Sequence, residues 1–496
     1  MRARWYDTAA VRVVCLALLF GFAPFVEAAH QGSLSNLANG DFWWHLRTGL
    51  GILQSHAMPH SGLYSQSSTL PWMAPSWLYD VLSAIAYRVL DLRVIPLAAI
   101  ACKFALAVMA FLLAGGLRGR FWPAVLLSAI AQYILINLPP LPMYCSALLF
   151  AAELLLLMGP LSAGDVRWLY GLPPLFLLWA NMDVQFVIGV FVLLLFGVAT
   201  VLEYWGARSG IEWLERTANL NLKSLFAVTA ASLIATMLTP YGWRLYGVFF
   251  AQVTSAANPY FPGFLALRFR SPQDYVLLLL LAASFLALGM RRSRDLFQIT
   301  LLLLCAFASF HSQRDAWLAT LAAVAVLGFP TSGPASEEEP KSPALQRSQA
   351  MFAAVLALLL IVAAAVIHFP RSHTALLAKV GRAYPVAAAA YIRDHGLPQP
   401  LFNSIAWGGF LTWDLPEYPV AIDGRTDLYG DDFNIQYAKV MNAEAHFSTF
   451  APFNQAATLL LEKNSLMGKA LPAVAGFKVV YSDNVAVVLV REPPQP

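Results

Sequence analysis

"MFAAVLALLLIVAAAVIHF", residues 351–369, contains no Lys, Arg, Asp or Glu. A helix of about 20 apolar residues crosses the hydrocarbon core of a bilayer, and this stretch is long enough to do so. The segment "VRVVCLALLFGFAPFVEAA", residues 11–29, is similar in length and character. Across the chain 59% of residues are hydrophobic and 12% are charged, whereas soluble domains carry roughly 25% charged residues. The sequence therefore predicts a polytopic α-helical membrane protein.

Apolar runs predict about eleven spans in all. They are centred near residues 13–29, 94–116, 122–137, 143–160, 168–180, 183–204, 223–238, 273–290, 295–311, 314–330 and 349–369. The first run also suits a cleavable signal peptide, because it has a basic start and small residues near Ala28. Its length and the spans that follow favour retention as a transmembrane helix. The four cysteines (Cys15, Cys102, Cys145 and Cys305) all lie in apolar stretches and suit small core residues better than a disulfide framework.

Basic residues between the spans set the orientation, because loops rich in Lys and Arg stay in the cytoplasm. These residues are Arg2, Arg4, Arg12, Arg118, Arg120, Arg167, Arg208, Arg216, Lys341, Arg347 and the run "RRSR" at 291–294. All fall on one side if residues 75–93 form an amphipathic helix along the outer interface instead of a span. We therefore expect a multi-pass protein of the inner (plasma) membrane with a cytoplasmic N-terminus.

This orientation defines the regions of the chain. We expect a transmembrane domain over 1–330 with external loops at 30–93 and 239–272, a flexible cytoplasmic linker over 331–348, a last span over 349–369, and an extracytoplasmic domain over 370–496. The final region holds 10 Lys and Arg and 11 Asp and Glu in 127 residues. This charge density exceeds that of the rest and is typical of a water-facing domain.

The C-terminal region has the patterns of a mixed α/β domain. "YPVAAAAYIRDHG" (384–396) predicts a helix that ends at Gly396. "YPVAIDG" (418–424), "FKVVYSD" (477–483) and "VAVVLVR" (485–491) predict strands. The expected fold is therefore a polytopic helical membrane domain with a soluble α/β domain at its C-terminal end.

The stretch "NGDFWWHLRTG", residues 39–49, follows the first span directly. Its two tryptophans suit the membrane interface, where aromatic rings are half in lipid. Asp41 is less easily explained, because a carboxylate held at membrane level is costly and marks a candidate site. His45 and Arg47 follow on the same turn, where they would bind phosphate or pair with the carboxylate.

Several motifs together resemble the GT-C superfamily of integral membrane glycosyltransferases, which includes oligosaccharyltransferase catalytic subunits and protein O-mannosyltransferases. They are "GDFWWHLRTG" (40–49), "W-x-x-PSWLYD" (72–80), "LTPYGWRLY" (238–246), "SQRD" (312–315) and "WGGFLTWDLPEYPVAIDGRTDLYGDDF" (407–433). The resemblance implies transfer of a sugar from a polyprenyl-phosphate carrier on the outer face, with inversion at the anomeric carbon. The acceptor would be a protein, a lipid or a polymer.

The resemblance also implies roles for particular residues. Asp41 matches the acidic residue of the first loop, which acts as a general base or orients the acceptor; Asp80 and Asp183 are further catalytic candidates. The candidates for binding the donor phosphate are His45, Arg47, Arg244, Arg268, Arg270 and Arg314. For the arginines the alternative is snorkelling at the interface, and for Asp183 it is a hydrogen-bonded turn with Asn181. The second loop has no DxD pair, so a divalent cation (Mg²⁺ or Mn²⁺) stays open as a cofactor.

The motif at 407–433 supplies candidates for acceptor binding. They are Trp407, Gly408, Gly409, Asp423, Arg425 and Asp427. The two glycines permit a close backbone approach or a strained turn. The charged residues, with Asp431 and Asp432, would gather at a strand end. The alternatives are an Asp–Arg network that ties two loops together and a calcium site.

Two other functions compete with glycosyl transfer. A transporter or flippase would show internal repeats with ionisable residues near the midplane. The chain shows no repeat between its halves, and its ionisable residues gather in external loops. The second is a non-catalytic membrane protein whose external domain binds glycan or peptide. Nothing in the net charge of +4 indicates a nucleic-acid partner, because basic residues in such proteins mostly set orientation.

Overall fold

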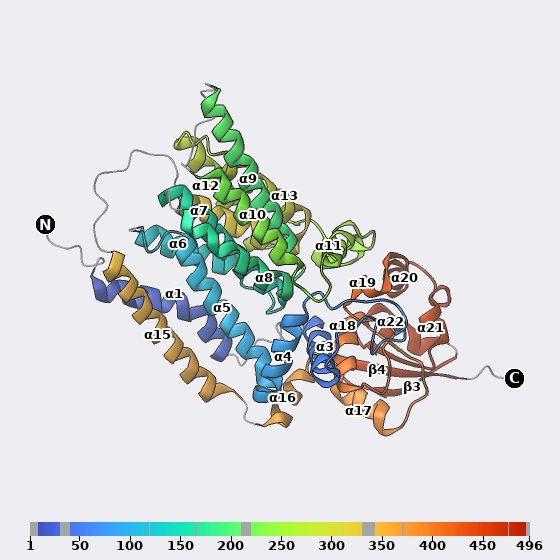
Figure 1. Ribbon diagram of the computed structural model, residues 1–496. Coiled ribbons are helices and arrows are strands. Elements are labelled where there is room, and N and C mark those ends of the chain that lie inside the picture. The colour runs from blue at the N-terminus through green and yellow to red at the C-terminus, as the bar shows by residue number, and fades with distance from the viewer. Residues whose placement is uncertain are drawn as a thin grey trace. The chain divides into compact units, whose positions relative to one another are not determined.

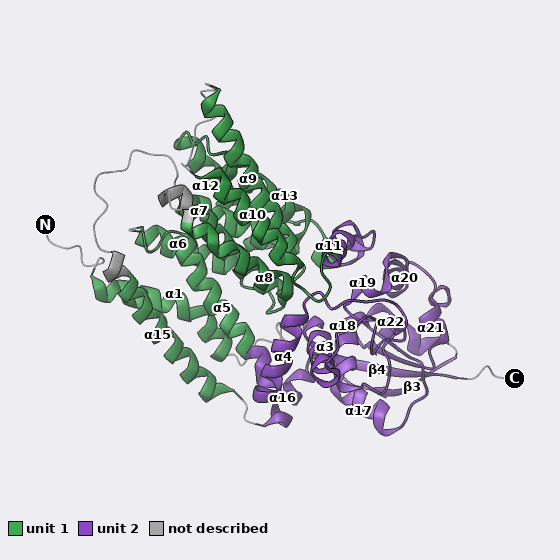
Figure 2. Cartoon of the chain, viewed as in Figure 1, with its two compact units in different colours: residues 1–31, 97–243, 262–369 green, residues 32–96, 244–261, 370–496 purple. Residues whose placement is uncertain are grey.

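The computed structural model describes residues 8–29, 40–118, 120–163, 166–209, 220–329, 343–369, 372–474 and 476–492. Its contacts divide the chain into two units (Figure 2). The helical unit comprises residues 1–31, 97–243 and 262–369. The mixed unit comprises residues 32–96, 244–261 and 370–496. Most of the predicted linker at 331–348 lies outside the described residues.

The helical unit is built almost entirely of apolar helices (Figure 1). They are α1 (Ala9–Ala29), α5 (Val94–Leu113, mostly in this unit), α6 (Phe121–Ile134), α7 (Pro142–Ala163), α8 (Leu172–Met182), α9 (Phe186–Arg208), α10 (Leu222–Met237), α12 (Pro272–Met290), α13 (Leu296–His311), α14 (Ala316–Gly328) and α15 (Pro343–His368). Short 3₁₀ turns lie between them: η3 (Val166–Gly171), η5 (Pro262–Phe264) and η6 (Gln313–Asp315).

Six helices of the described chain are long and apolar enough to cross a membrane. They are Ala9–Ala29, Trp77–Leu113, Pro142–Gly159, Phe186–Arg208, Pro272–Met290 and Arg347–His368. Three shorter apolar helices, α6, α10 and α13, accompany them. The polytopic helical fold is therefore confirmed, while the number of spans stays a prediction. The placement of residues 75–93 along the outer interface also stays a prediction.

The helices of this unit differ in how much of their surface is buried. Helix α14 is buried on all sides, as expected for a helix that is apolar around its whole circumference. Helix α1 packs against α15, and α15 exposes large apolar side chains such as Met351, Phe352 and Val362, the kind of surface that a lipid-facing helix carries. Lys103 pairs with the buried Glu27 at 2.6 Å, so α5 and α1 share an ion pair that neutralises both charges.

The mixed unit contains a sheet in the order β1-β2-β4-β3. Strands β1 (Leu401–Asn403) and β2 (Thr458–Glu462) are parallel, whereas β4 (Ala486–Arg491) is antiparallel to β2 and to β3 (Phe477–Ser482). The helices of the unit are α3 (Asp41–Ser55), α4 (Trp77–Leu90), α11 (Arg244–Thr254), α16 (His373–Val380), α17 (Val386–Asp394), α18 (Ile405–Asp414), α19 (Thr426–Tyr429), α20 (Asp431–Met441), α21 (Ala451–Gln455) and α22 (Leu466–Ala470). Its 3₁₀ turns are η2 (Asp91–Arg93), η4 (Asn258–Tyr260), η7 (Phe447–Thr449) and η8 (Leu471–Ala473).

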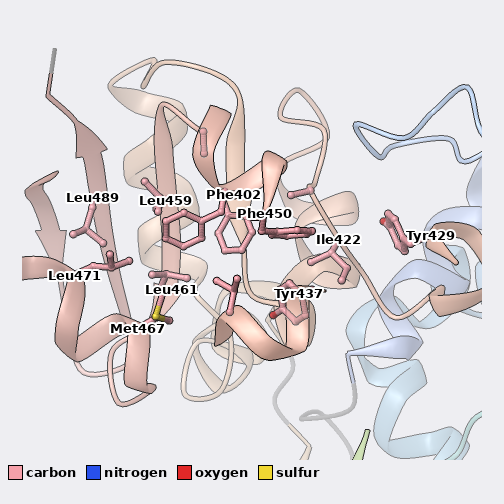
Figure 3. Close-up of a cluster of buried hydrophobic side chains, with 14 of the residues drawn as sticks. Phe402, Ile422, Tyr429, Tyr437, Phe450, Leu459, Leu461, Met467, Leu471 and Leu489 are labelled. Carbon is pink, nitrogen blue, oxygen red and sulfur yellow. The ribbon is translucent and has the colours of Figure 1, made fainter. Parts of the chain in front are cut away.

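One apolar core lies between the sheet and these helices. Figure 3 shows Phe402, Leu459 and Leu489 of the strands against Phe450 and Tyr437. The same cluster includes two tryptophans that are distant in sequence from the sheet, Trp44 and Trp72. The core therefore joins the first loop to the C-terminal region, because burial of these large apolar surfaces stabilises their contact.

Three of the four C-terminal predictions hold. The helix at 384–396 is α17, and Gly396 follows it with a φ of +55°. The stretches "FKVVYSD" and "VAVVLVR" are β3 and β4. The prediction of a strand at 418–424 was wrong, because this buried segment makes its backbone hydrogen bonds elsewhere. The Asn403 side chain binds the amide of Ala421 and the carbonyl of Ile422 at 2.8 and 2.7 Å.

The division into units differs from a simple cut at residue 370. Residues 32–96 and 244–261, which belong to the two expected loops, form one unit with the C-terminal region. Helix α3 packs against both α4 and α18. Ser255 and Ala256 donate hydrogen bonds to Asp431 of α20. Both loop segments are thus parts of the C-terminal fold, not separate connections.

Candidate functional site

Asp41 is the first residue of α3, with Gly40 as the preceding cap residue. A carboxylate in the first turn interacts favourably with the helix dipole. The indole Nε1 of Trp44 donates to Oδ1 of Asp41 at 3.2 Å. A Cβ added to Gly424 would lie only 1.9 Å from the same oxygen. The carboxylate is half-buried and lies between the Trp44 indole and the backbone at Gly424, where any larger residue would displace it.

The glycines of the 407–433 motif bring backbones close together, as predicted. A Cβ on Gly409 would lie 2.3 Å from the carbonyl oxygen of Gly40, and one on Gly408 would lie 2.0 Å from that of Ile422. Both distances are shorter than atoms can approach, so only glycine permits this packing. Trp407 is 4% exposed, and its Nε1 donates to the carbonyl of Ala383 at 3.2 Å. The glycines thus position α18 against the start of α3, next to Asp41.

His45 and Asp80 form a buried pair between α3 and α4. His45 Nδ1 lies 2.6 Å from Asp80 Oδ1, and the two residues are 5% and 0% exposed. The ring of His45 stacks on that of Trp44 with 3.6 Å between centroids. The other carboxylate oxygen of Asp80 is buried and has no hydrogen-bond partner within the described chain. The structure thus brings two predicted site residues together, though neither faces solvent.

Asp423, Arg425 and Asp427 form a network between two loops. The guanidinium of Arg425 donates to Oδ1 of Asp423 at 3.0 Å and to its Oδ2 at 2.6 Å, and to the carbonyl of Leu63 at 3.0 Å. Asp427 accepts a hydrogen bond from Trp72 Nε1 at 3.1 Å. The cluster does not lie at a strand end, because segment 418–424 is not a strand. This arrangement matches the alternative of an Asp–Arg network that ties two loops together; a role in acceptor binding stays a prediction.

The arginines predicted to bind phosphate are divided between the units. In the mixed unit, Arg47 lies over the ring of Tyr64 at 4.3 Å, and its buried Nε has no hydrogen-bond partner among the described residues. Arg244 begins α11 and is exposed. In the helical unit, Arg268 and Arg270 are exposed.

Arg314 lies in the 3₁₀ turn η6, where it contacts Phe264 at 4.6 Å and Asp315 at 3.8 Å. Asp315 also accepts a hydrogen bond from Gln185 at 3.2 Å. Sequence reasoning gave no role to Asp315 or Gln185. The motif "SQRD" was the available signal for Asp315, and its contact across the helical unit was not visible in the sequence.

Asp183 ends α8 inside the helical unit and is 6% exposed. Ser146 of α7 donates to its Oδ2 at 2.7 Å, and Trp179 donates in turn to Ser146 at 2.7 Å. The neighbouring Asn181 donates to the carbonyls of Leu177 and Leu238. Asp183 is thus a buried, hydrogen-bonded carboxylate that links α7 to the end of α8.

The candidate metal ligands were compared by their positions in the described residues. No group of three or more His, Cys, Asp or Glu side chains in that part of the chain is placed to hold an ion. The cluster at 423–432 does not converge, because Asp423 pairs with Arg425 while Asp427 binds Trp72. A divalent cation therefore stays a prediction.

Solved structures resemble this chain in fold, whereas its sequence matches no known family. No protein-family model matches the chain, and no curated protein matches it. The archaeal oligosaccharyltransferase AglB from Archaeoglobus fulgidus, in complex with an inhibitory peptide and a dolichol-phosphate, is 12% identical and covers 95% of this chain and 71% of that chain, with a TM-score of 0.50. The Archaeoglobus fulgidus oligosaccharyltransferase tethered with an acceptor peptide containing the NVT sequon is 11% identical and covers 99% and 75%, with a TM-score of 0.49. ArnT from Cupriavidus metallidurans, bound to undecaprenyl phosphate, is 14% identical and covers 97% of each chain, with a TM-score of 0.46.

The similarity to the AglB structure extends over nearly the whole chain. At 12% identity it establishes the architecture and not the chemistry. This chain shares the fold of that membrane oligosaccharyltransferase, as the resemblance noted in its motifs led us to expect.

Proposed function

We propose that this protein is a membrane glycosyltransferase that moves a sugar from a polyprenyl-phosphate carrier to an acceptor hydroxyl on the outer face of the membrane. The observation that carries the proposal is the placement of Asp41. Its carboxylate is half-buried at the start of α3 and is held by Trp44 and Gly424. Two further observations support the proposal. The fold is GT-C-like, and the motif around Asp41 resembles the one that carries the first-loop acid of those enzymes.

The proposed reaction is a single displacement. Asp41 orients the acceptor hydroxyl and takes its proton as the oxygen attacks the anomeric carbon. The new glycosidic bond forms while the bond from that carbon to the phosphate oxygen breaks. The electron pair of the broken bond leaves with the polyprenyl phosphate. Attack from the face opposite the leaving group inverts the configuration.

Arginines are suited to stabilising the departing phosphate, because the guanidinium fork matches its oxygens. Arg47 and Arg244 in the mixed unit and Arg268, Arg270 and Arg314 in the helical unit are the candidates. Arg47 has a feature of its own: its Nε is buried without a hydrogen-bond partner among the described residues. A buried donor of this kind is costly unless a ligand satisfies it.

Asp80 is proposed to act through its neighbours. It holds His45, whose ring stacks on Trp44, and Trp44 donates to Asp41. This sequence of contacts fixes the indole that orients the Asp41 carboxylate. Asp80 is therefore a positioning residue in the proposal, because its burial separates it from the reacting atoms.

The proposal is tested with the full chain reconstituted in lipid bilayers. A panel of polyprenyl-phosphate sugars is supplied with glycan, peptide and lipid acceptors, and release of the polyprenyl phosphate is measured. The proposal predicts consumption of at least one donor and a product of inverted anomeric configuration. If no donor is consumed across the panel while glycans or peptides still bind, the protein is a non-catalytic binder instead.

A further inference from the structure

A pocket of about 350 Å³ lies within the mixed unit. One wall is the second half of α3, and the other is the loop that follows it, from residue 57 to residue 64. Trp72 and Arg425 also line it. Its volume is at the lower end of the range for small-molecule sites, and most of its lining lies outside the motifs that indicated function.

The lining combines neutral hydrogen-bonding groups with apolar surface. Thr48, Gln54 and Tyr64 supply a hydroxyl, an amide and a phenol, whereas Met58 and Trp72 supply apolar surface. The Gln54 side chain is exposed and that of Tyr64 is half-buried, so both are accessible to a ligand. This combination suits a molecule with several hydroxyl groups and one apolar face.

The electrostatics of the pocket favour a neutral ligand. The only Lys, Arg, Asp or Glu among its described lining residues is Arg425. Its guanidinium is 2% exposed and is held by Asp423 at 2.6 Å. This ion pair cancels the charge locally, and the exposed His60 is the other lining group that can carry a charge. We therefore expect neutral groups to bind here better than phosphate or carboxylate groups. A sugar ring without ionised groups fits these requirements.

Tyr64, which lines the pocket, is held in place by its backbone and by its neighbours. Tyr64 has a φ of +68°, a left-handed conformation that is uncommon for a bulky residue and persists only where the surroundings enforce it. Its carbonyl accepts a hydrogen bond from the amide of Val420 at 3.2 Å. A Cβ on Gly51 would lie 2.6 Å from the Tyr64 hydroxyl, so a glycine in α3 leaves room for the phenol. A preformed pocket of this kind saves the ligand the cost of ordering a loop.

The pocket and Asp41 share neighbours. Gly424 touches Asp41, and the next residue, Arg425, lines the pocket. Trp44 donates to Asp41 and makes an edge contact with Trp72, whose ring lies 6.0 Å away between centroids. Contacts through Trp72 and Trp44, and through Arg425 and Gly424, therefore connect the pocket lining to the candidate base.

We propose that this pocket is a subsite for a neutral pyranose ring and that the ring belongs to an acceptor glycan. The inference deepens the proposed function and rests on it for its catalytic relevance, whereas binding itself does not depend on turnover. The donor sugar is the other possible source of such a ring. Competition with a polyprenyl-phosphate sugar separates the two sources.

Binding is measured by saturation-transfer NMR on the full chain in lipid nanodiscs. The probes are neutral methyl pyranosides and short neutral oligosaccharides at millimolar concentration, together with methyl glucuronide as the charged comparison. Ala57→Phe fills the pocket from an exposed loop position that lines it. Thr69→Phe is the matched control, because it adds the same ring at an exposed position of the loop away from the lining.

The inference expects at least one neutral glycoside to bind, with glucuronide weaker, and about a tenfold or greater loss of affinity in Ala57→Phe but not in Thr69→Phe. It is overturned if no neutral glycoside binds, if glucuronide binds equally well, or if both variants bind like the wild type. Displacement of the bound glycoside by a polyprenyl-phosphate sugar assigns the ring to the donor and overturns the acceptor assignment. Glycan binding without donor consumption would contradict the proposed function alone, and donor consumption that is insensitive to Ala57→Phe would contradict this inference alone.

Discussion

Gly424 has no side chain, and this lets the 423–427 loop approach the carboxylate of Asp41 closely. In Gly424→Ala the new methyl group would displace the carboxylate. We expect a loss of about 1–3 kcal/mol in the free energy of unfolding, as for other overpacked sites, and loss of most donor turnover. Gly247→Ala is the matched control, because nothing lies within 4 Å of its added Cβ; equal turnover in the two variants would contradict the assignment.

Asp80 provides a second prediction for single residues. Asp80→Asn retains an oxygen that can accept from His45, so the fold should persist. Turnover should fall by about ten- to a hundredfold, as is typical when a residue behind a functional group is altered, and the pH profile of kcat should shift. Unchanged turnover with a changed melting temperature would leave Asp80 a purely structural role.

The roles of single residues were predictable from the sequence where they depend only on the residue type and its near neighbours in the chain. Asp41 followed from its position after a span, and the close approach at Gly408 and Gly409 followed from their lack of side chains. The pairing of His45 with Asp80 could not be predicted, because it depends on how α3 packs against α4. The different partners of Asp423 and Asp427, Arg425 and Trp72, could not be predicted either, because Trp72 lies far away in the sequence.

The junction of α11 with α20 is the most informative contact between elements. The Ser255 hydroxyl and the Ala256 amide donate to the carboxylate of Asp431 at 2.5 and 2.9 Å, and these bonds hold the pKa of that carboxyl below its usual value of 3.8. Because the folded-state pKa is the lower one, the stabilisation is present above pH 3.8 and is lost as the pH falls through the folded-state value.

The Asp431→Asn variant tests this junction. Amides of residues 244–257 should exchange with deuterium about fivefold faster at neutral pH, equivalent to about 1 kcal/mol. In the wild type the difference from the variant should shrink as the pH falls below 3.8. Asp432→Asn is the control, because it removes an adjacent carboxylate on the same turn; equal acceleration in both variants would show that the contact is not specific.

Among the elements, helices and strands with a clear period were predicted well, and the segment at 418–424 was not. Its apolar residues are buried, as in a strand, but Asn403 and the 64–66 loop take its backbone hydrogen bonds. Burial and strand pairing produce the same sequence pattern here, so composition alone could not separate them. Strand β1 was missed because it has only three residues, and β2 because a short apolar run cannot be told from a buried helix by its pattern.

For the whole molecule, the decisive property is which side of the membrane the mixed unit faces. The distribution of basic residues predicts the outer side for residue 69 and the cytoplasm for residue 208. Thr69→Cys should therefore react with a membrane-impermeant thiol reagent in intact cells, and Arg208→Cys only after permeabilisation. The native cysteines are replaced by alanine in both variants; the reverse labelling pattern would contradict the orientation.

The polytopic fold and the α/β region were predictable because apolar length and strand period are local properties. The union of residues 32–96 and 244–261 with the C-terminal region was not, because segments separated by hundreds of residues meet through Trp44, Trp72 and Asp431.

The central claim is that the Asp41 carboxylate activates an acceptor for attack on a lipid-linked sugar. It is tested most directly by comparing wild type, Asp41→Asn and Asp41→Glu in bilayers that contain a donor which the wild type consumes, with the melting temperature measured for each. The account predicts that Asp41→Asn releases polyprenyl phosphate at least about a hundredfold more slowly, that Asp41→Glu retains part of the activity, and that all three stay folded. Undiminished release by a folded Asp41→Asn protein would contradict it.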